Sequence, residues 1–101
     1  MNGQRLKGML GLALRARKAV LGTDASRILI RSGKCGVLLL DEAAGVNTRK
    51  KAEDLCRQTG TPIRTVPEHL IGDATGRSNI VMGVQDGSFA EQILAETERI
   101  S

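Results

Sequence analysis

The sequence predicts an α/β fold, a three-layer α/β/α sandwich around a mostly parallel, mixed sheet of four strands. Segments with apolar residues at helical spacing alternate along the chain with short segments rich in β-branched and aliphatic residues. Val37–Leu40 is a continuous apolar run of strand length, which is typical of a strand covered on both faces. Strands connected through helices usually run in the same direction, so the alternation favours parallel pairing.

The first part of the chain contains two predicted helices separated by a short strand. Apolar residues recur every three or four positions between residues 4 and 16, which predicts the first helix. The segment Ala19–Leu21 has the composition of a strand. Thr23 or Asp24 can cap the second helix, and Gly33 can end it in a left-handed conformation.

The middle of the chain repeats this order after the buried strand. Asn47 or Thr48 is a suitable N-cap for a third helix, which we expect to end near Gln58. Ile63–Val66 reads as the next strand, and Pro67 stops it because proline cannot donate to a ladder. The segment therefore predicts another helix followed by another strand.

The last part contains a short helical turn, a strand and a long helix. The turn is predicted over Glu68–Ala74 and leads into a polar loop, Gly76–Asn79. Ile80–Val84 is apolar and of strand length. Ser88 is expected to cap the final helix, which continues to about Ile100.

Length and composition exclude several classes of protein. A chain of 101 residues with 41% apolar residues supports one core, so we expect a single domain over residues 1–101. Phe89 is the only aromatic residue, which excludes RNA recognition by stacking on aromatic rings. The longest apolar run is too short to span a bilayer, and the N-terminus lacks the pattern of a signal peptide. We therefore expect a cytoplasmic protein without a membrane partner.

Positive charge is concentrated in the first third of the chain. The formal net charge is +4, but residues 1–34 carry +7, residues 35–67 carry +1 and residues 68–101 carry −4. This distribution predicts a surface that faces a polyanion, with a solvated helix face as the alternative. The run at residues 49–51 is either a solvated face or an extension of that surface.

The sequence offers no set of residues for metal binding or catalysis. Cys35, Cys56 and His69 are too few for a zinc site, and we expect two free buried thiols. His69 has no evident nucleophile beside it, and Asp41 is expected to cap the loop that follows its strand. No glycine cluster has the spacing of a nucleotide-binding loop. We expect no cofactor, no metal and no enzymatic activity.

Two segments carry a resemblance to a known family. They are LALRARKAVLGTDASRILIRSGKCGVLLL, from residue 12, and TGTPIRTVPEHLIGDATGRSNIVMGVQD, from residue 59. Their order and spacing resemble the bacterial YlxQ family, which belongs to the superfamily of ribosomal proteins L-seven-Ae and L-thirty-e that bind kink-turn RNA. The resemblance covers nearly the whole chain and implies an L-thirty-e-like fold and RNA binding.

The resemblance also implies where RNA binds. The family uses the start of its second helix and the loop before its last strand, where backbone N–H groups and a glycine allow close approach of a phosphate. Basic residues nearby add phosphate contacts. The residues implied are Arg17, Lys18, Gly22, Thr23, Asp24, Arg27, Lys34, Arg77, Ser78 and Asn79.

The second helix departs from the motif of the ribosomal members, Gly-x-Asn-Glu-x-x-Lys. Asp24, Ala25 and Ile28 stand at the positions of the Asn, the Glu and the Lys. An ionised Asp only accepts hydrogen bonds and repels phosphate, whereas Asn both donates and accepts. Binding of RNA needs only the glycine, the amides and the cations, whereas kink-turn specificity also needs the replaced polar groups.

The expected function is therefore non-catalytic binding of a structured RNA by a monomer. Ribosomal RNA or another kink-turn-like RNA is the partner that the resemblance implies, in association with the ribosome or translation. A protein–protein adaptor is the alternative, since the acidic last third suits a basic partner. RNA 2′-O-methyltransferases carry a similar domain, but no catalytic domain follows Ser101 in this sequence.

Overall fold

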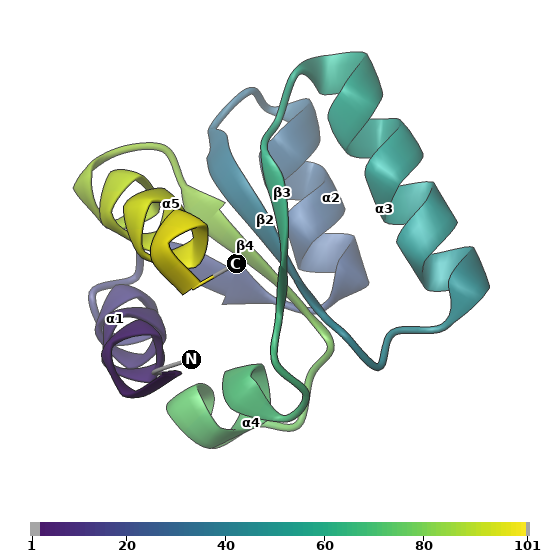
Figure 1. The fold of residues 1–101 in the computed structure, drawn as a ribbon. Helices are drawn as coiled ribbons and strands as arrows, with labels where there is room; N and C mark the ends of the chain where they lie inside the picture. Colours follow the sequence, from purple (N-terminus) through teal and green to yellow (C-terminus); the bar gives the residue numbers. More distant parts are fainter. Residues whose placement is uncertain (1–2, 101) are drawn as a thin grey trace.

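The computed structural model describes residues 3–100, and the nine predicted elements are all present within them (Figure 1). Their boundaries lie within a few residues of those expected from the sequence. In chain order they are α1 (Gly3–Arg15), β1 (Ala19–Leu21), α2 (Thr23–Arg31), β2 (Cys35–Asp41), α3 (Val46–Thr59), β3 (Ile63–Val66), α4 (Leu70–Thr75), β4 (Val81–Gln85) and α5 (Ser88–Ile100).

The four strands form a mixed sheet in the order β1-β4-β2-β3. β2 and β3 are parallel, with Leu38 opposite Ile63, whereas β4 is antiparallel to both of its neighbours, with Leu40 opposite Val81. Three strands therefore run in one direction, but the expectation that parallel pairing predominates is wrong. The reason is α4, whose six residues span only about 9 Å and cannot return the chain along the sheet. β4 consequently begins at the end where β3 stops.

The two ends of the sheet are distinct. At the α4 end, β1, β2 and β3 finish and β4 begins; at the Lys34 end, those three strands begin and β4 finishes. β2 has seven residues, so the ends lie about 23 Å apart.

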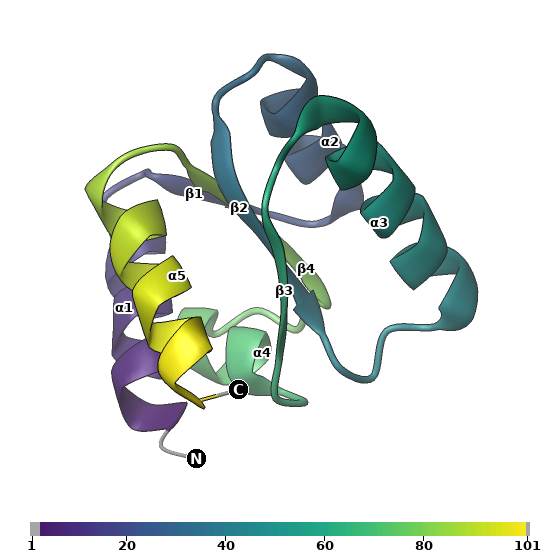
Figure 2. The same ribbon diagram turned by 45° about the horizontal axis from the view of Figure 1, so that its top comes forward.

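Helices cover both faces of the sheet (Figure 2). Val37 and Leu39 face the layer of α1, α4 and α5, and Leu38 and Leu40 face the layer of α2 and α3. All four side chains are buried, which confirms the prediction from the continuous apolar run. The three-layer α/β/α sandwich is also confirmed.

The helix starts differ from the prediction. Thr23, Asp24, Asn47 and Thr48 are not N-caps, because α2 begins after Gly22 and α3 begins after Gly45, each without a side-chain cap. The N-cap is a glycine in both helices, so α2 starts one or two residues earlier than predicted and α3 starts two or three residues earlier.

The helix ends agree with the prediction. Gly33 and Gly60 have φ angles of +75° and +72°, the left-handed conformation that glycine adopts without steric cost. The N–H of Gly60 donates to the carbonyl of Cys56, which closes the last turn of α3.

Both cysteines are free, but only Cys56 is fully buried, so the prediction of two buried thiols is wrong for the half-buried Cys35. Burial raises the pKa of both thiols, that of Cys56 to about 11. Among residues 3–100, no cluster of His, Cys, Asp and Glu could hold a metal ion. The same residues include no helix long and apolar enough to cross a membrane.

Candidate nucleic-acid interface

Two predicted loops meet at the α4 end of the sheet. The N–H of Gly22 donates to the carbonyl of Val81 at 2.9 Å, which places the start of α2 beside the start of β4. A Cβ on Gly22 would lie 3.7 Å from the Oδ1 of Asn79. The structure therefore brings the segment 22–27 and the segment 77–79 together, as the resemblance implied.

The start of α2 presents unpaired backbone donors. Gly22 has a φ of +93°, a conformation that favours glycine. The first backbone hydrogen bond of the helix runs from the N–H of Ser26 to the carbonyl of Gly22, at 3.1 Å. The preceding amides have no capping side chain, and Thr23 and Asp24 are exposed. Donors of this kind, at the positive end of a helix, suit a phosphate or a base edge.

Asp24 and Arg27 interact on the outer side of α2. Their Oδ1 and Nη1 atoms lie 3.6 Å apart, and the side chains are 94% and 46% exposed. Such exposed pairs contribute little to stability. The Asp24 carboxylate therefore stands at the place where an RNA strand would approach, and it partly neutralises the nearest cation.

A buried carboxylate positions the second loop. The Oδ1 of Asp41 accepts the N–H of Ala43 at 2.7 Å, which confirms that Asp41 caps the following loop. Its Oδ2 accepts the N–H of His69 at 3.0 Å, directly before α4. The His69 side chain is 80% exposed, so this histidine is a surface residue.

The segment after α4 is also fixed by local hydrogen bonds. Gly76 ends α4 in a left-handed conformation with φ +74°, and the N–H of Arg77 donates to Oγ1 of Thr75 at 3.3 Å. A cavity of about 420 Å³ lies beside this turn, between the end of β2 and Asn79. Its lining residues are Asp41, Ala43, Glu68, His69, Gly72, Asp73, Gly76, Ser78, Asn79 and Ile80.

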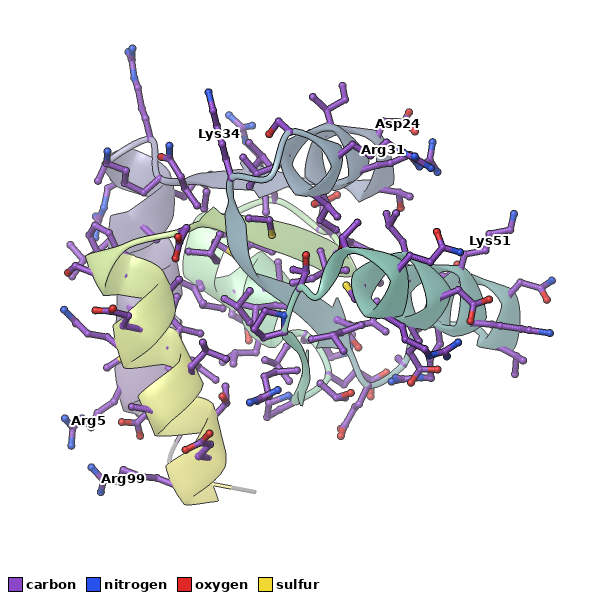
Figure 3. The ribbon with its side chains drawn as sticks, turned by 90° about the horizontal axis from the view of Figure 1, so that it is seen from above. Arg5, Asp24, Arg31, Lys34, Lys51 and Arg99 are labelled. Atoms are coloured by element: carbon purple, nitrogen blue, oxygen red, sulfur yellow. The ribbon has the colours of Figure 1, made fainter. Side chains whose placement is uncertain are left out.

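Three predicted phosphate contacts lie at the other end of the sheet. The carbonyls of Lys18 and Lys34 accept the N–H groups of Gln85 and Asp86 at 2.7 and 2.8 Å, so both lysines flank the end of β4. Arg17 precedes Lys18 in the same turn. Figure 3 shows the side chain of Lys34 extending away from the turn between α2 and β2. The ten predicted residues thus form two groups, not one.

The two ends differ in charge. The α4 end combines arginines with several exposed carboxylates, whereas the Lys34 end is strongly basic. Beside the two loops at the α4 end the exposed charges are Asp24, Arg27, Glu42, Glu68, Asp73 and Arg77, and Lys50 and Lys51 follow in the first turns of α3. At the Lys34 end they are Arg15, Arg17, Lys18, Lys34 and Asp86. The cations around Lys34 therefore form a second surface that favours a polyanion.

Comparison with known proteins identifies relatives over nearly the full length. No family model matches the chain. The RNA-binding protein YlxQ of Bacillus subtilis (strain 168) is 35% identical over 97 residues, covering 94% of this chain and 97% of the relative. The RNA-binding protein YlxQ of Enterococcus faecium is 29% identical over 92 residues, covering 90% and 89%.

Two solved structures are similar to the whole chain. A protein of unknown function from Bacillus halodurans has a TM-score of 0.88 at 29% identity, with 96% of this chain and 99% of that chain covered. The 15.5 kD RNA binding protein of Giardia lamblia has a TM-score of 0.76 at 14% identity, with 95% and 87% covered.

In this sandwich β4 lies between β1 and β2, and the start of α2 faces the loop before β4. These features define a protein with the fold of the L-seven-Ae and L-thirty-e superfamily. Both named relatives are called RNA-binding proteins, and neither name describes an enzyme. The chain belongs to the YlxQ family. The resemblance predicted from the sequence is thereby confirmed.

Proposed function

We propose that this protein is a non-enzymatic RNA-binding protein that recognises a structured RNA at the α4 end of its sheet. The observation that carries the proposal is the closeness of the two loops: the N–H of Gly22 donates to the carbonyl of Val81, and a Cβ on Gly22 would lie 3.7 Å from the Oδ1 of Asn79. The names of the YlxQ relatives support RNA as the ligand.

The chemistry of this surface suits base edges as well as phosphates. The amides at the start of α2 donate, and the side-chain amide of Asn79 both donates and accepts. An RNA whose backbone is sharply bent exposes such edges, whereas a regular duplex hides them in a deep, narrow major groove. The finer proposal is therefore a kink-turn or similar RNA, in a ribosome- or translation-associated role.

Asn79 also offers a side-chain amide near the start of α2, where Asp24 replaces the Asn of the superfamily motif. The superfamily motif has an amide side chain at that position, and here an amide reaches the helix start from the neighbouring loop. Part of the lost hydrogen-bonding capacity is thereby restored from a different element. Arg27 supplies a charge one position before the missing lysine.

Fluorescence anisotropy with a labelled kink-turn hairpin and a plain duplex of equal length tests the proposal. We expect the wild type to prefer the hairpin and Asn79→Ala to weaken hairpin binding about tenfold, the scale of one good side-chain contact to a base. Gln92→Ala removes an exposed amide on α5 and serves as the matched control.

Two results would contradict the proposal. If neither RNA binds, the adaptor function is favoured, and proteins that remain bound to the chain after nuclease treatment of a lysate would identify its partners. If Asn79→Ala and Gln92→Ala bind the hairpin as the wild type does, the RNA site lies elsewhere. Size-exclusion chromatography of the free protein checks the expected monomer.

A further inference from the structure

A groove of about 450 Å³ separates α2 from α3 on the face of the sheet opposite α1 and α5. Both helices return the chain from the α4 end to the Lys34 end, so they are parallel and the groove runs along them. Ala52 forms part of the α3 wall, and its small side chain leaves space that a larger residue would fill.

The inner surface of the groove is apolar. Leu38 and Val81 form its floor and are 2% and 3% exposed. Leu55 and Ala52 add half-buried apolar surface from α3. Ser26, which is 2% exposed, also lines the groove, and its hydroxyl has no hydrogen-bond partner in the described structure.

The rim of the groove is cationic. Arg31 on α2 and Lys51 on α3 are exposed, and neither forms an ion pair within residues 3–100 (Figure 3). Asp54 also borders the groove, but its Oδ1 lies 3.1 Å from Nη2 of Arg57. The uncompensated charge around the apolar floor is therefore positive.

The groove is continuous with the proposed RNA surface. Thr23 and Arg27 belong to the start of α2 and also line the groove. From there the groove leads towards Arg31, in the direction of the Lys34 end. It therefore provides a path between the two groups of basic and loop residues, which lie at opposite ends of the sheet.

We propose that this groove receives one unstacked base of a single-stranded RNA segment that extends from the RNA bound at the α4 end. Arg31 and Lys51 contact the phosphates on either side of that base. The inference rests on the proposed function. A base has apolar faces and polar edges, so aliphatic walls hold its faces and the Ser26 hydroxyl meets an edge. Guanidinium planes also stack on bases, which suits Arg27 and Arg31 in a chain without Trp or Tyr.

Two hairpin probes isolate the groove from the α4 end. The first is a blunt kink-turn hairpin, and the second carries six extra uridines, placed on either strand in separate versions. We expect one extended version to bind the wild type about fivefold more tightly than the blunt hairpin, the lower end of the range for one stacked base. Ala52→Met fills the groove without changing charge, and we expect it to abolish this gain while blunt-hairpin affinity stays unchanged.

Charge variants separate specific phosphate contacts from general attraction. Arg31→Glu is expected to abolish the gain, whereas Lys7→Glu, the same type of charge reversal on exposed α1, is expected to retain it. A 4-thiouridine in the extension should crosslink to peptides within residues 23–31 or 47–58. Thermal melting of each variant verifies that it remains folded.

The outcomes are distinct. If the blunt hairpin does not bind, the proposed function and this inference both fail. If the blunt hairpin binds but neither extension increases affinity, or the gain survives in Ala52→Met, only this inference fails. A glutamate-rich peptide that binds the wild type and not Arg31→Glu, without any gain from RNA extensions, would assign the groove to a protein partner and overturn the proposal.

Discussion

The Oδ2 of Asp41 accepts a hydrogen bond from the backbone N–H of His69 at 3.0 Å, although 28 residues separate them in the chain. Asp41 ends β2 and is only 4% exposed. His69 precedes α4 with a φ of +69°, a left-handed conformation that is unusual for a residue with a Cβ. The carboxylate thus anchors the helix that leads into the loop at residues 77–79.

Replacing Asp41 by Ala should lower the free energy of unfolding by about 2–3 kcal/mol, because two part-buried backbone donors lose the carboxylate that accepts from both of them. Urea denaturation measures this change. Glu42→Ala is the control, since Glu42 also accepts a backbone N–H, from Glu68 at 3.2 Å, but is exposed. Equal losses for the two variants would contradict an anchoring role for Asp41.

Arg17 occupies a position where glycine is expected. Its φ is +60°, and its N–H and that of Lys18 close the end of α1 by donating to the carbonyls of Leu14 and Ala13. Arg17→Gly should therefore stabilise the fold by about 1 kcal/mol, because glycine adopts this conformation without strain. The same variant should bind a plain duplex more weakly because a cation is lost.

Lys18→Ala is the matched control for Arg17→Gly. It removes a neighbouring cation from a residue without a positive φ. We expect it to weaken duplex binding without increasing the melting temperature. A variant Arg17→Gly that is less stable than the wild type would contradict the strain at this turn.

Asp24→Asn should increase affinity for both a kink-turn hairpin and a plain duplex. The substitution removes a negative charge from the start of α2 and releases Arg27 from its ion pair. Asn also restores a donor, so the hairpin should gain up to about 1–3 kcal/mol more than the duplex, the scale of a side-chain contact to a base. Anisotropy titrations of both RNAs measure the difference.

Equal gains on the two RNAs would show that Asp24 acts through its charge alone. No gain on either would show that the start of α2 does not contact RNA. Asp73→Asn is a suitable control, because Asp73 is an exposed carboxylate on α4 at the same end of the sheet.

The salt dependence of binding reports how many phosphates the basic residues contact. If the protein makes about four to six phosphate contacts, the logarithm of the affinity should fall with the logarithm of salt concentration at a slope of about −3 to −5. Reversing the charges of Arg17 and Lys18 should make the slope shallower. Lys7→Glu on α1 provides a control, and an unchanged slope in the double variant would place the phosphates elsewhere, for example at residues 49–51.

Alkaline stability should depend on Cys56. Its pKa is raised from 9.0 to about 11 by burial, so between these values the folded chain binds more protons than the unfolded chain. The free energy of unfolding should therefore fall as pH rises from 9 to 11, by up to about 1.4 kcal/mol per pH unit. Cys56→Ala should show a flatter profile, to which the raised pKa of Cys35 still contributes, and parallel profiles would contradict this assignment.

The sequence was sufficient to predict the elements, because each depends on local periodicity and on breakers such as Gly33 and Pro67. The direction of β4 was not predictable in the same way. It depends on the length of α4, whose six residues are too few to return the chain along the sheet. It also depends on the pairing of the other strands, because β4 lies between β1 and β2. Such relationships are properties of the assembled sheet.

The candidate site was predicted residue by residue but not in its arrangement. Lys18 and Gly22 are four positions apart in sequence, yet β1 extends between them and assigns them to opposite ends of the sheet. The link from Asp41 to His69 has no sequence signal, because an Asp after a buried strand most often caps its own loop. The groove beside Ala52 likewise appears only when α2 and α3 are side by side.

The position of β4 also determines when the protein can fold during synthesis. Among residues 3–100, β1 pairs only with β4, and β4 separates it from β2, so the first strand has no partner until residues 81–85 have left the ribosome. A nascent chain that ends before Val81 exposes the edges of β1 and β2 and lacks the residues that join them. Folding therefore requires contacts between residues that are distant in sequence, so we expect it to be slower than the folding of a helical bundle of the same size.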